Sequence, residues 1–295
     1  MIEFPISGVE TYWWLPPLVA FLVSALASTG GLSGAFILLP FQVSILGFAS
    51  PAVTPTNLVF NAIAIPGGVY RFCREKRMLW RLLLVIILGS LPGLVLGAII
   101  RVQYLPDPAV FKFFIGLVLL YIGSRLGFGI FGKATNKGSQ GVGIVLSERF
   151  EKGQIYFEYN DETHQVPVLM LFLLSTLIGV IGGIYGIGGG AILIPILVAI
   201  YRLPVYTISG AALAGTFVNS VAGVAIYYVV NSIYSESSMM ILPDWLLGLS
   251  LGIGGLAGIY MGATIQKYMP VRLIKTILTV SLLIIAFKYI WGYLT

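Results

Sequence analysis

The sequence predicts an all-α polytopic membrane protein made of two inverted repeats, and three observations support this prediction. Of its 295 residues, 58% are hydrophobic and only 9% are charged, with a mean hydropathy of +0.98, whereas soluble domains are about one quarter charged. Residues 178–195, IGVIGGIYGIGGGAILIP, place many glycines inside an apolar stretch, and residues 28–40, STGGLSGAFILLP, are a weaker copy. Charged residues gather between the apolar segments and assign the two halves opposite orientations.

Each half contains about five apolar segments. In order, these are Tyr12–Thr29, Ala35–Leu46, Thr56–Tyr70, Leu79–Ile100 and Val110–Phe131, followed by Val166–Tyr185, Ala191–Tyr201, Val205–Val230, Trp245–Ile265 and Leu273–Leu294. A helix that crosses a bilayer needs about 20 residues, so the three shortest segments predict half-helices or re-entrant arms and a total of roughly 8–10 membrane segments. Ordinary tilted spans kinked at Pro40 or Pro195 are the alternative.

The two glycine-rich stretches predict two broken helices. At membrane depth, irregular backbone survives only where protein or a water-filled cavity satisfies its polar groups. Glycine lets a helix break and lets another backbone or a ligand come close. We therefore expect the two breaks to face one another at the midplane of the membrane, across a transport path.

The spacing of glycines and prolines recurs between the halves. A shift of 155 residues places Gly34 on Gly189 and Pro40 on Pro195, and a shift of 165 applies after ten extra residues in the second half. The second shift aligns two GxxxGxxxGA runs, in which the small residues lie on one helix face and let backbones approach closely. The aligned glycines are Gly89, Gly93 and Gly97 in the first half and Gly254, Gly258 and Gly262 in the second.

The positions of the basic residues predict the topology. With the N-terminus outside and five segments per half, fourteen of the seventeen Lys and Arg residues fall on the cytoplasmic side, as the positive-inside rule requires. Arg101, Lys112 and Lys288 then fall outside, as does the acidic loop with Glu236 and Asp244. An odd number of segments per half makes the repeats inverted. The expected units are a first repeat at 1–131, a cytoplasmic linker at 132–165 and a second repeat at 166–295. Within the linker, the alternation of Gln154–Tyr159 and the turn-like residues 160–162 predict a β-hairpin.

Several kinds of chemistry are disfavoured by the residues that the apolar segments lack. No Asp or Glu lies inside them, and the chain has one histidine, His164, and one cysteine, Cys73. This argues against an intramembrane protease, a metal site and a carboxylate proton relay, so we expect neither an enzyme nor a cofactor. The net charge of +6 lies in loops that orient the chain in the lipid bilayer, and we expect no nucleic-acid partner. The run Gly186–Gly190 lacks the preceding strand and the following acidic residue of a dinucleotide loop.

Uncharged polar residues and glycines near the two breaks are the candidate substrate-binding groups. A half-helix that begins near Ser33 or Gly189 would direct N–H groups and the positive end of its dipole into the cavity, which suits an anion. Hydrogen bonds between helices are the structural alternative for the asparagines. The candidates are Ser33, Gly34, Thr56, Asn57, Asn61, Tyr185, Gly188, Gly189, Gly190, Thr216, Asn219 and Ser220.

Three stretches resemble one known family. VTPTNLVFNAIAIPGGVYR (Val53–Arg71), GVIGGIYGIGGGAILIPIL (Gly179–Leu197) and SGAALAGTFVNSVAGVAIYY (Ser209–Tyr228) are similar to the sulfite exporter TauE/SafE family of membrane permeases. The resemblance implies export of sulfite or of organosulfonates such as sulfoacetate across the inner (plasma) membrane. It also implies that the path is lined by Thr56, Asn57, Asn61, Gly188 to Gly190 and Thr216. Ser33 and Ala35 replace two glycines of the second break, which weakens the expectation that both breaks are used equally.

The sequence thus predicts a secondary transporter that exports a small anion, sulfite or an organosulfonate, by alternating access. An importer or exchanger of another anion and a non-transporting assembly subunit of the membrane are the alternatives. Substrate, direction, coupling ion and the choice between a monomer and a homodimer are left open by the sequence.

Overall fold

The computed structural model confirms the all-α membrane architecture. It describes residues 1–29, 33–76, 78–131, 148–159, 162–201, 203, 205–234, 239–265 and 271–295. Six helices of this part of the chain are long and apolar enough to cross a membrane. The helices of the first half are α1 (Leu15–Thr29), α2 (Ala35–Ser44), α3 (Val53–Ala64), α4 (Pro66–Arg74), α5 (Trp80–Gln103) and α6 (Pro108–Phe131). Those of the second half are α7 (Val168–Tyr185), α8 (Gly190–Tyr201), α9 (Val205–Ile233), α10 (Trp245–Ile265) and α11 (Val271–Leu294).

The expected segment Thr56–Tyr70 is divided between two helices. α3 ends at Ala64 and α4 begins at Pro66, because proline lacks the N–H that would continue the helix and is favoured at the first helical position. The first membrane helix also begins later than the apolar pattern indicates. Strand β1 (Ile2–Phe4) pairs with strand β2 (Val9–Thr11) in an antiparallel hairpin, and α1 starts only at Leu15.

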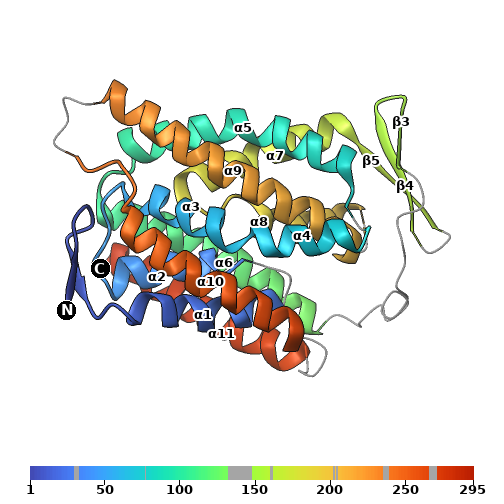
Figure 1. The fold of residues 1–295 in the computed structure, drawn as a ribbon. Helices are drawn as coiled ribbons and strands as arrows, with labels where there is room; N and C mark the ends of the chain where they lie inside the picture. Colours follow the sequence, from blue (N-terminus) through green and yellow to red (C-terminus); the bar gives the residue numbers. More distant parts are fainter. Residues whose placement is uncertain are drawn as a thin grey trace.

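The long helices of the two halves pack in exchanged pairs. Helix α5 of the first half lies along α7 of the second, and α10 of the second half lies along α1 of the first (Figure 1). Each glycine of the two GxxxGxxxGA runs meets a backbone carbonyl of its partner helix, so a Cβ at any of these positions would clash. The matching contacts are Gly89–Phe172 with Gly254–Pro17, Gly93–Thr176 with Gly258–Phe21, and Gly97–Val180 with Gly262–Ala25. The residue numbers of matching glycines differ by 165, and those of the residues whose carbonyls they meet differ by 155. These are the two shifts of the repeat, so both helix pairs have the register that the repeat predicts.

The ends of the molecule differ in what they carry. Both termini and the β1–β2 hairpin lie at one end, and the linker sheet lies at the other (Figure 1). Accordingly α1 begins at the end of the hairpin, whereas α7, its counterpart in the repeat, begins at the end of the sheet. Which end faces the cytoplasm stays a prediction.

The linker contains a three-stranded antiparallel sheet in the order β3 (Glu148–Glu151), β4 (Gln154–Tyr159) and β5 (Glu162–Pro167). Strands β4 and β5 coincide with the expected hairpin, and residues 160–161 of its turn lie outside the described residues. Strand β3 was not expected. Its residue Glu148 accepts hydrogen bonds from the backbone N–H groups of Arg81 (2.8 Å) and Leu82 (3.0 Å), so the sheet caps the first turn of α5.

An acidic residue likewise holds the first turn of α10, the counterpart of α5. The sequence placed Asp244 in an outer loop, yet the residue is only 1% exposed. Its carboxylate accepts hydrogen bonds from the N–H of Leu247 (3.0 Å) and from the N–H and Oγ of Ser7 (2.9 and 2.8 Å). Asp244 therefore caps α10 and fastens the N-terminal hairpin to it.

Candidate functional site

The predicted break in the second half lies between α7 and α8. Helix α7 ends at Tyr185, and Gly186, Gly188 and Gly189 follow with φ angles of +82°, +66° and +93°. This left-handed backbone is strained for any residue with a side chain. The chain reverses within these few residues, and α8 starts at Gly190. The glycines of this run are thus required by the backbone conformation of the break.

Side chains of the first half satisfy carbonyl groups that the break leaves without helical partners. The hydroxyl of Thr54 donates to Ile184 O (2.9 Å), and the amides of Asn57 and Asn61 donate to Gly186 O (3.1 and 3.3 Å). A helix that ends inside a membrane exposes its last carbonyls to a medium with no water to bind them. Three polar residues of α3 therefore stabilise the end of α7 across the interface between the halves.

Helix α9 supports the same break from its own half. The amide of Asn219 donates to Gly188 O (3.2 Å), and the hydroxyl of Tyr227 donates to Gly183 O (2.7 Å). The hydroxyl of Thr216 accepts a hydrogen bond from Gly190 N (3.0 Å) and donates to Ala212 O (2.9 Å), so it caps the start of α8. Ser220, one turn along, donates to Thr216 O (2.7 Å).

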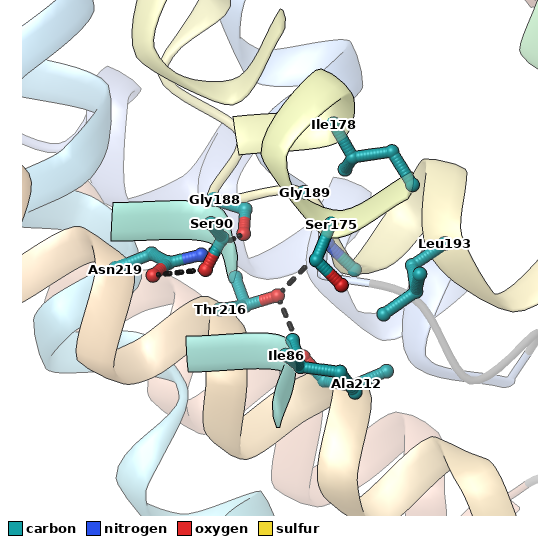
Figure 2. A pocket seen from close by; sticks show the side chains of 11 residues that line it. Ile86, Ser90, Ser175, Ile178, Gly188, Gly189, Leu193, Ala212, Thr216 and Asn219 are labelled. Carbon is teal, nitrogen blue, oxygen red and sulfur yellow. Dashed lines mark hydrogen bonds between the residues drawn. The ribbon is translucent and has the colours of Figure 1, made fainter. Parts of the chain in front are cut away.

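A small cavity lies beside this break, between α5, α7, α8 and α9 (Figure 2). Its volume, about 10 Å³ for the centres of water molecules, is close to what one water molecule needs. Among the described residues, no charged side chain lines it. The polar groups and glycines around it are Ser90, Ser175, Gly188, Gly189, Gly190, Thr216 and Asn219, and the apolar ones are Ile86, Ile178, Leu193 and Ala212.

The hydroxyls of Ser90 and Ser175 were absent from the sequence-based candidates. Ser90 donates to Asn219 Oδ1 (2.9 Å). Ser175 is fully buried, and its Oγ has no hydrogen-bond partner among the described residues. In Figure 2 Ser175 lies beside the cavity, between Thr216 and Leu193. Both serines neighbour the glycine face on which α5 packs against α7, and that neighbourhood is the signal that could have identified them.

The first break is packed differently. Ser33 and Gly34 are buried, but Gly34 has an ordinary helical φ of −68° and α2 begins directly after it. A Cβ on Gly34 would lie 2.7 Å from Ser24 Oγ, which is itself buried without a hydrogen-bond partner among the described residues. Residues 30–32, the glycines of this stretch and Leu32, lie outside the described residues.

Asn57 and Tyr185 connect the two breaks. The amide of Asn57 donates both to Ala35 O (3.2 Å), at the start of α2, and to Gly186 O, while its oxygen accepts from Gln42 (3.2 Å). The hydroxyl of Tyr185 donates to Phe36 O (2.8 Å). The two broken helices are therefore neighbours, held together by hydrogen bonds from side chain to backbone.

Thr56 lies elsewhere. Its hydroxyl donates to Ala52 O (2.7 Å) and accepts from Asp244 N (2.9 Å). It thus joins the start of α3 to the start of α10, at the end of the molecule that carries the termini. The other candidates gather at the breaks, with Gly188, Gly189, Gly190, Thr216 and Asn219 at the cavity itself.

Arg101 corrects the expectation that it belongs to an outer loop. It lies within α5, is fully buried and places its guanidinium 3.6 Å from the centre of the Phe111 ring. Its donors reach Thr54 Oγ1 (3.3 Å), Leu105 O, and the carbonyls of Ala49 (3.2 Å) and Ser50 (3.1 Å). Thr54 in turn donates to Ile184 O, so only the Thr54 side chain separates the guanidinium from the carboxyl end of α7. A positive charge is favourable at that end of a helix.

Comparison with known proteins agrees with this architecture. The sulfite exporter TauE/SafE family model matches residues 17–289. The chain is 21% identical to the probable membrane transporter protein YunE of Bacillus subtilis (strain 168) over 93% of this chain and 96% of that protein. It is 24% identical to the probable membrane transporter protein y4hK of Sinorhizobium fredii (strain NBRC 101917 / NGR234), over 92% and 96%.

No solved structure matches the chain. Within the described residues, no group of three or more His, Cys, Asp or Glu side chains could hold a metal ion. The paired broken helices and the match along nearly the whole chain identify this multi-pass membrane protein as a member of the sulfite exporter TauE/SafE family of membrane transporters.

Proposed function

We propose that the protein is a secondary transporter that exports a small anion, sulfite or an organosulfonate, by alternating access at the α7–α8 break. The observation that carries this proposal is the uncharged cavity at the start of α8, which hydroxyl and amide groups line together with apolar side chains. Helix N-termini and loops of successive backbone N–H groups favour anions. Neutral donors bind an anion weakly enough for it to leave again. A buried lysine or arginine at the cavity would slow its release.

The described conformation corresponds in this proposal to a closed state. The cavity has room for about one water molecule, so an oxyanion requires α8 and α9 to move away from α5 and α7. The opposite directions of α1 and α7 support two inverted units that rock about this site. Ser175 and Asn219 would then face the anion, and the free hydroxyl of Ser175 would gain its missing partner.

Membrane potential alone can drive such export. Moving one negative charge out of a cell with a negative interior releases about 2.3 kcal/mol per 100 mV. No carboxylate relay is needed for this direction, which agrees with the absence of Asp and Glu from the cavity lining.

A transport assay in liposomes with Ser175→Ala tests the proposal. Purified protein should release sulfite or sulfoacetate from loaded vesicles, faster when the potential favours anion movement towards the face that carries the termini. Ser175→Ala should weaken the apparent Kd for the anion by about 10- to 150-fold, the value of one hydrogen bond to a charged group. Its thermal stability should not fall, because the Ser175 hydroxyl has no hydrogen bond to lose.

Ser281→Ala, on α11, is the matched control, since within the described part of the chain the Ser281 hydroxyl bonds only to carbonyls of its own helix. Release that is independent of the protein would reject the transporter proposal in favour of an assembly subunit. Uptake against the expected direction would favour the importer. Equal transport by Ser175→Ala and the parent would show that the substrate does not pass through the cavity.

A further inference from the structure

A groove of about 920 Å³ lies between α4 and α10, outside the site described above. Its origin is the kink at Pro66. Before the kink, α3 packs tightly on α10, where Gly252 and Gly255 admit the side chains of Ile63 and Phe60. After the kink, α4 departs from α10, and Gly67 and Gly68 contribute no side chains to fill the gap.

The inner part of the groove is apolar. Ala64 and Ile259 are buried at its base, and Leu256 and Tyr260 border it on α10. These two residues are 43% and 80% exposed, and they belong to the row of exposed apolar residues that α10 presents along its length. This wall therefore faces the hydrocarbon of the bilayer, and the groove opens towards lipid.

The mouth of the groove is basic. Arg71 and Arg74 lie on the last turn of α4, both exposed, and both line the groove. Arg71 bonds to Glu75 through its Nε (2.9 Å), so two arginines and one glutamate leave a net positive charge. Tyr70, 68% exposed, adds an aromatic ring with a polar hydroxyl at the same level, which suits the interface between lipid and water.

We propose that this groove binds an anionic phospholipid, with the phosphate at Arg71 and Arg74 and an acyl chain between α4 and α10. Charge complementarity and the apolar walls both favour this occupant, and the volume is within the range of about 300–1,000 Å³ typical of ligand sites. The groove lies towards the end that carries the linker sheet (Figure 1), the end assigned to the cytoplasm by charge. Basic pockets between membrane helices on that side are suited to anionic head groups.

The second half has no such site at the equivalent place. A shift of 155 puts Pro66 on Val221 and Arg71 on Ile226, and α9 runs without interruption through both positions. Without the proline there is no kink, and without the arginine there is no charge for a phosphate. The lipid site is therefore a property of one half only, and it does not depend on what the transporter carries.

Two kinds of variant separate the head group from the acyl chain. The double variant Arg71→Gln/Arg74→Gln removes the positive charges and leaves the groove open. Gly67→Leu fills the groove and keeps both arginines, because a Cβ at Gly67 meets no atom within 4 Å. Lys76→Gln is the matched control, since Lys76 is an exposed cation next to α4 that does not line the groove.

The measurement is native mass spectrometry of the full-length protein in mild detergent, titrated with dioleoyl phosphatidylglycerol or dioleoyl phosphatidylcholine. We expect tighter retention of phosphatidylglycerol by the parent. The double variant should bind it about 30-fold more weakly, Gly67→Leu should lose both lipids, and Lys76→Gln should behave as the parent. Glycerol phosphate, which has no acyl chain, should not compete at equal concentration.

Equal retention of the two lipids by the parent would overturn the proposal, as would equal losses in the double variant and Lys76→Gln. Unchanged binding by monodisperse Gly67→Leu would place the lipid elsewhere on the protein. Full competition by glycerol phosphate would show that the arginines bind a soluble phosphate instead.

Discussion

The break between α7 and α8 and the break before α2 occupy equivalent places in the two halves, yet they are built differently. The second break uses three glycines with positive φ and borders a small cavity with both polar and apolar lining residues. At the first, Gly34 is helical, and the start of α2 is tied down by Asn57. Donors from both halves hold the second break in place, and only there, among the described residues of the two breaks, does the backbone adopt positive φ angles. Equivalent sequence positions therefore differ in backbone conformation and in hydrogen bonding.

The largest effect should come from the glycine contacts that both halves share. A Cβ at Gly93 or Gly258 would overlap a backbone carbonyl of the partner helix, and such an obstacle yields only if the helices separate. We expect Gly93→Ala and Gly258→Ala each to lower the free energy of unfolding by about 3 kcal/mol, measured by melting in detergent. Unequal losses would show that the two exchanged pairs are not equivalent.

Gly189→Ala tests the left-handed backbone of the second break. The φ of +93° would cost a side chain about 1–2 kcal/mol, and the added Cβ would lie 2.8 Å from Ile178 Cγ2 beside the cavity. We expect transport in liposomes to fall by about 30-fold or more. Gly47→Ala is the control, because Gly47 has a similar φ of +72° and nothing within 4 Å. Equal transport by the two variants would mean that backbone strain alone matters.

A comparison of Asn57→Ala with Asn219→Ala separates support from binding. Asn57 loses hydrogen bonds to Ala35, Gly186 and Gln42, so at about 0.6 kcal/mol for each interhelical bond the free energy of unfolding should fall by roughly 2 kcal/mol. Asn219 lines the cavity, and its loss should also weaken the apparent Kd for sulfite by about 10-fold or more. If Asn57→Ala changed the Kd more than Asn219→Ala, the binding site would lie nearer the first break than proposed.

Ser24→Ala should have the smallest effect. Like Ser175, Ser24 is buried with an Oγ that lacks a hydrogen-bond partner among the described residues, but it lies against Gly34 at the first break. We expect its transport rate and melting temperature to stay within error of the parent, in contrast to Ser175→Ala. Loss of transport in Ser24→Ala would show that both breaks take part in binding.

The membrane class, the repeat and the second break could be read from the sequence. Apolar segments of sufficient length have few alternatives in lipid, because every backbone group must be bonded internally. The shifts of 155 and 165 likewise carried enough information to predict which glycines correspond, since only glycine lets two helix backbones touch. The run from Gly186 to Gly190 predicted a helix break, because so many glycines in an apolar stretch favour irregular backbone over a continuous helix.

Only the tertiary structure decided which polar residues surround the cavity. Ser90 and Ser175 come from α5 and α7, helices of different halves that meet through exchanged packing, and no local pattern encodes that meeting. Thr56 was placed with the site because of its neighbours in sequence. It bonds instead to the start of α10, because its side chain lies on a different face of α3 from those of Asn57 and Asn61. Arg101 follows one apolar segment and Asp244 precedes another, so both were assigned to loops. Their partners, backbone groups from distant parts of the chain, hold both inside the protein. Sequence spacing determines which residues share a helix face, but the neighbours of that face are set by packing over long sequence distances.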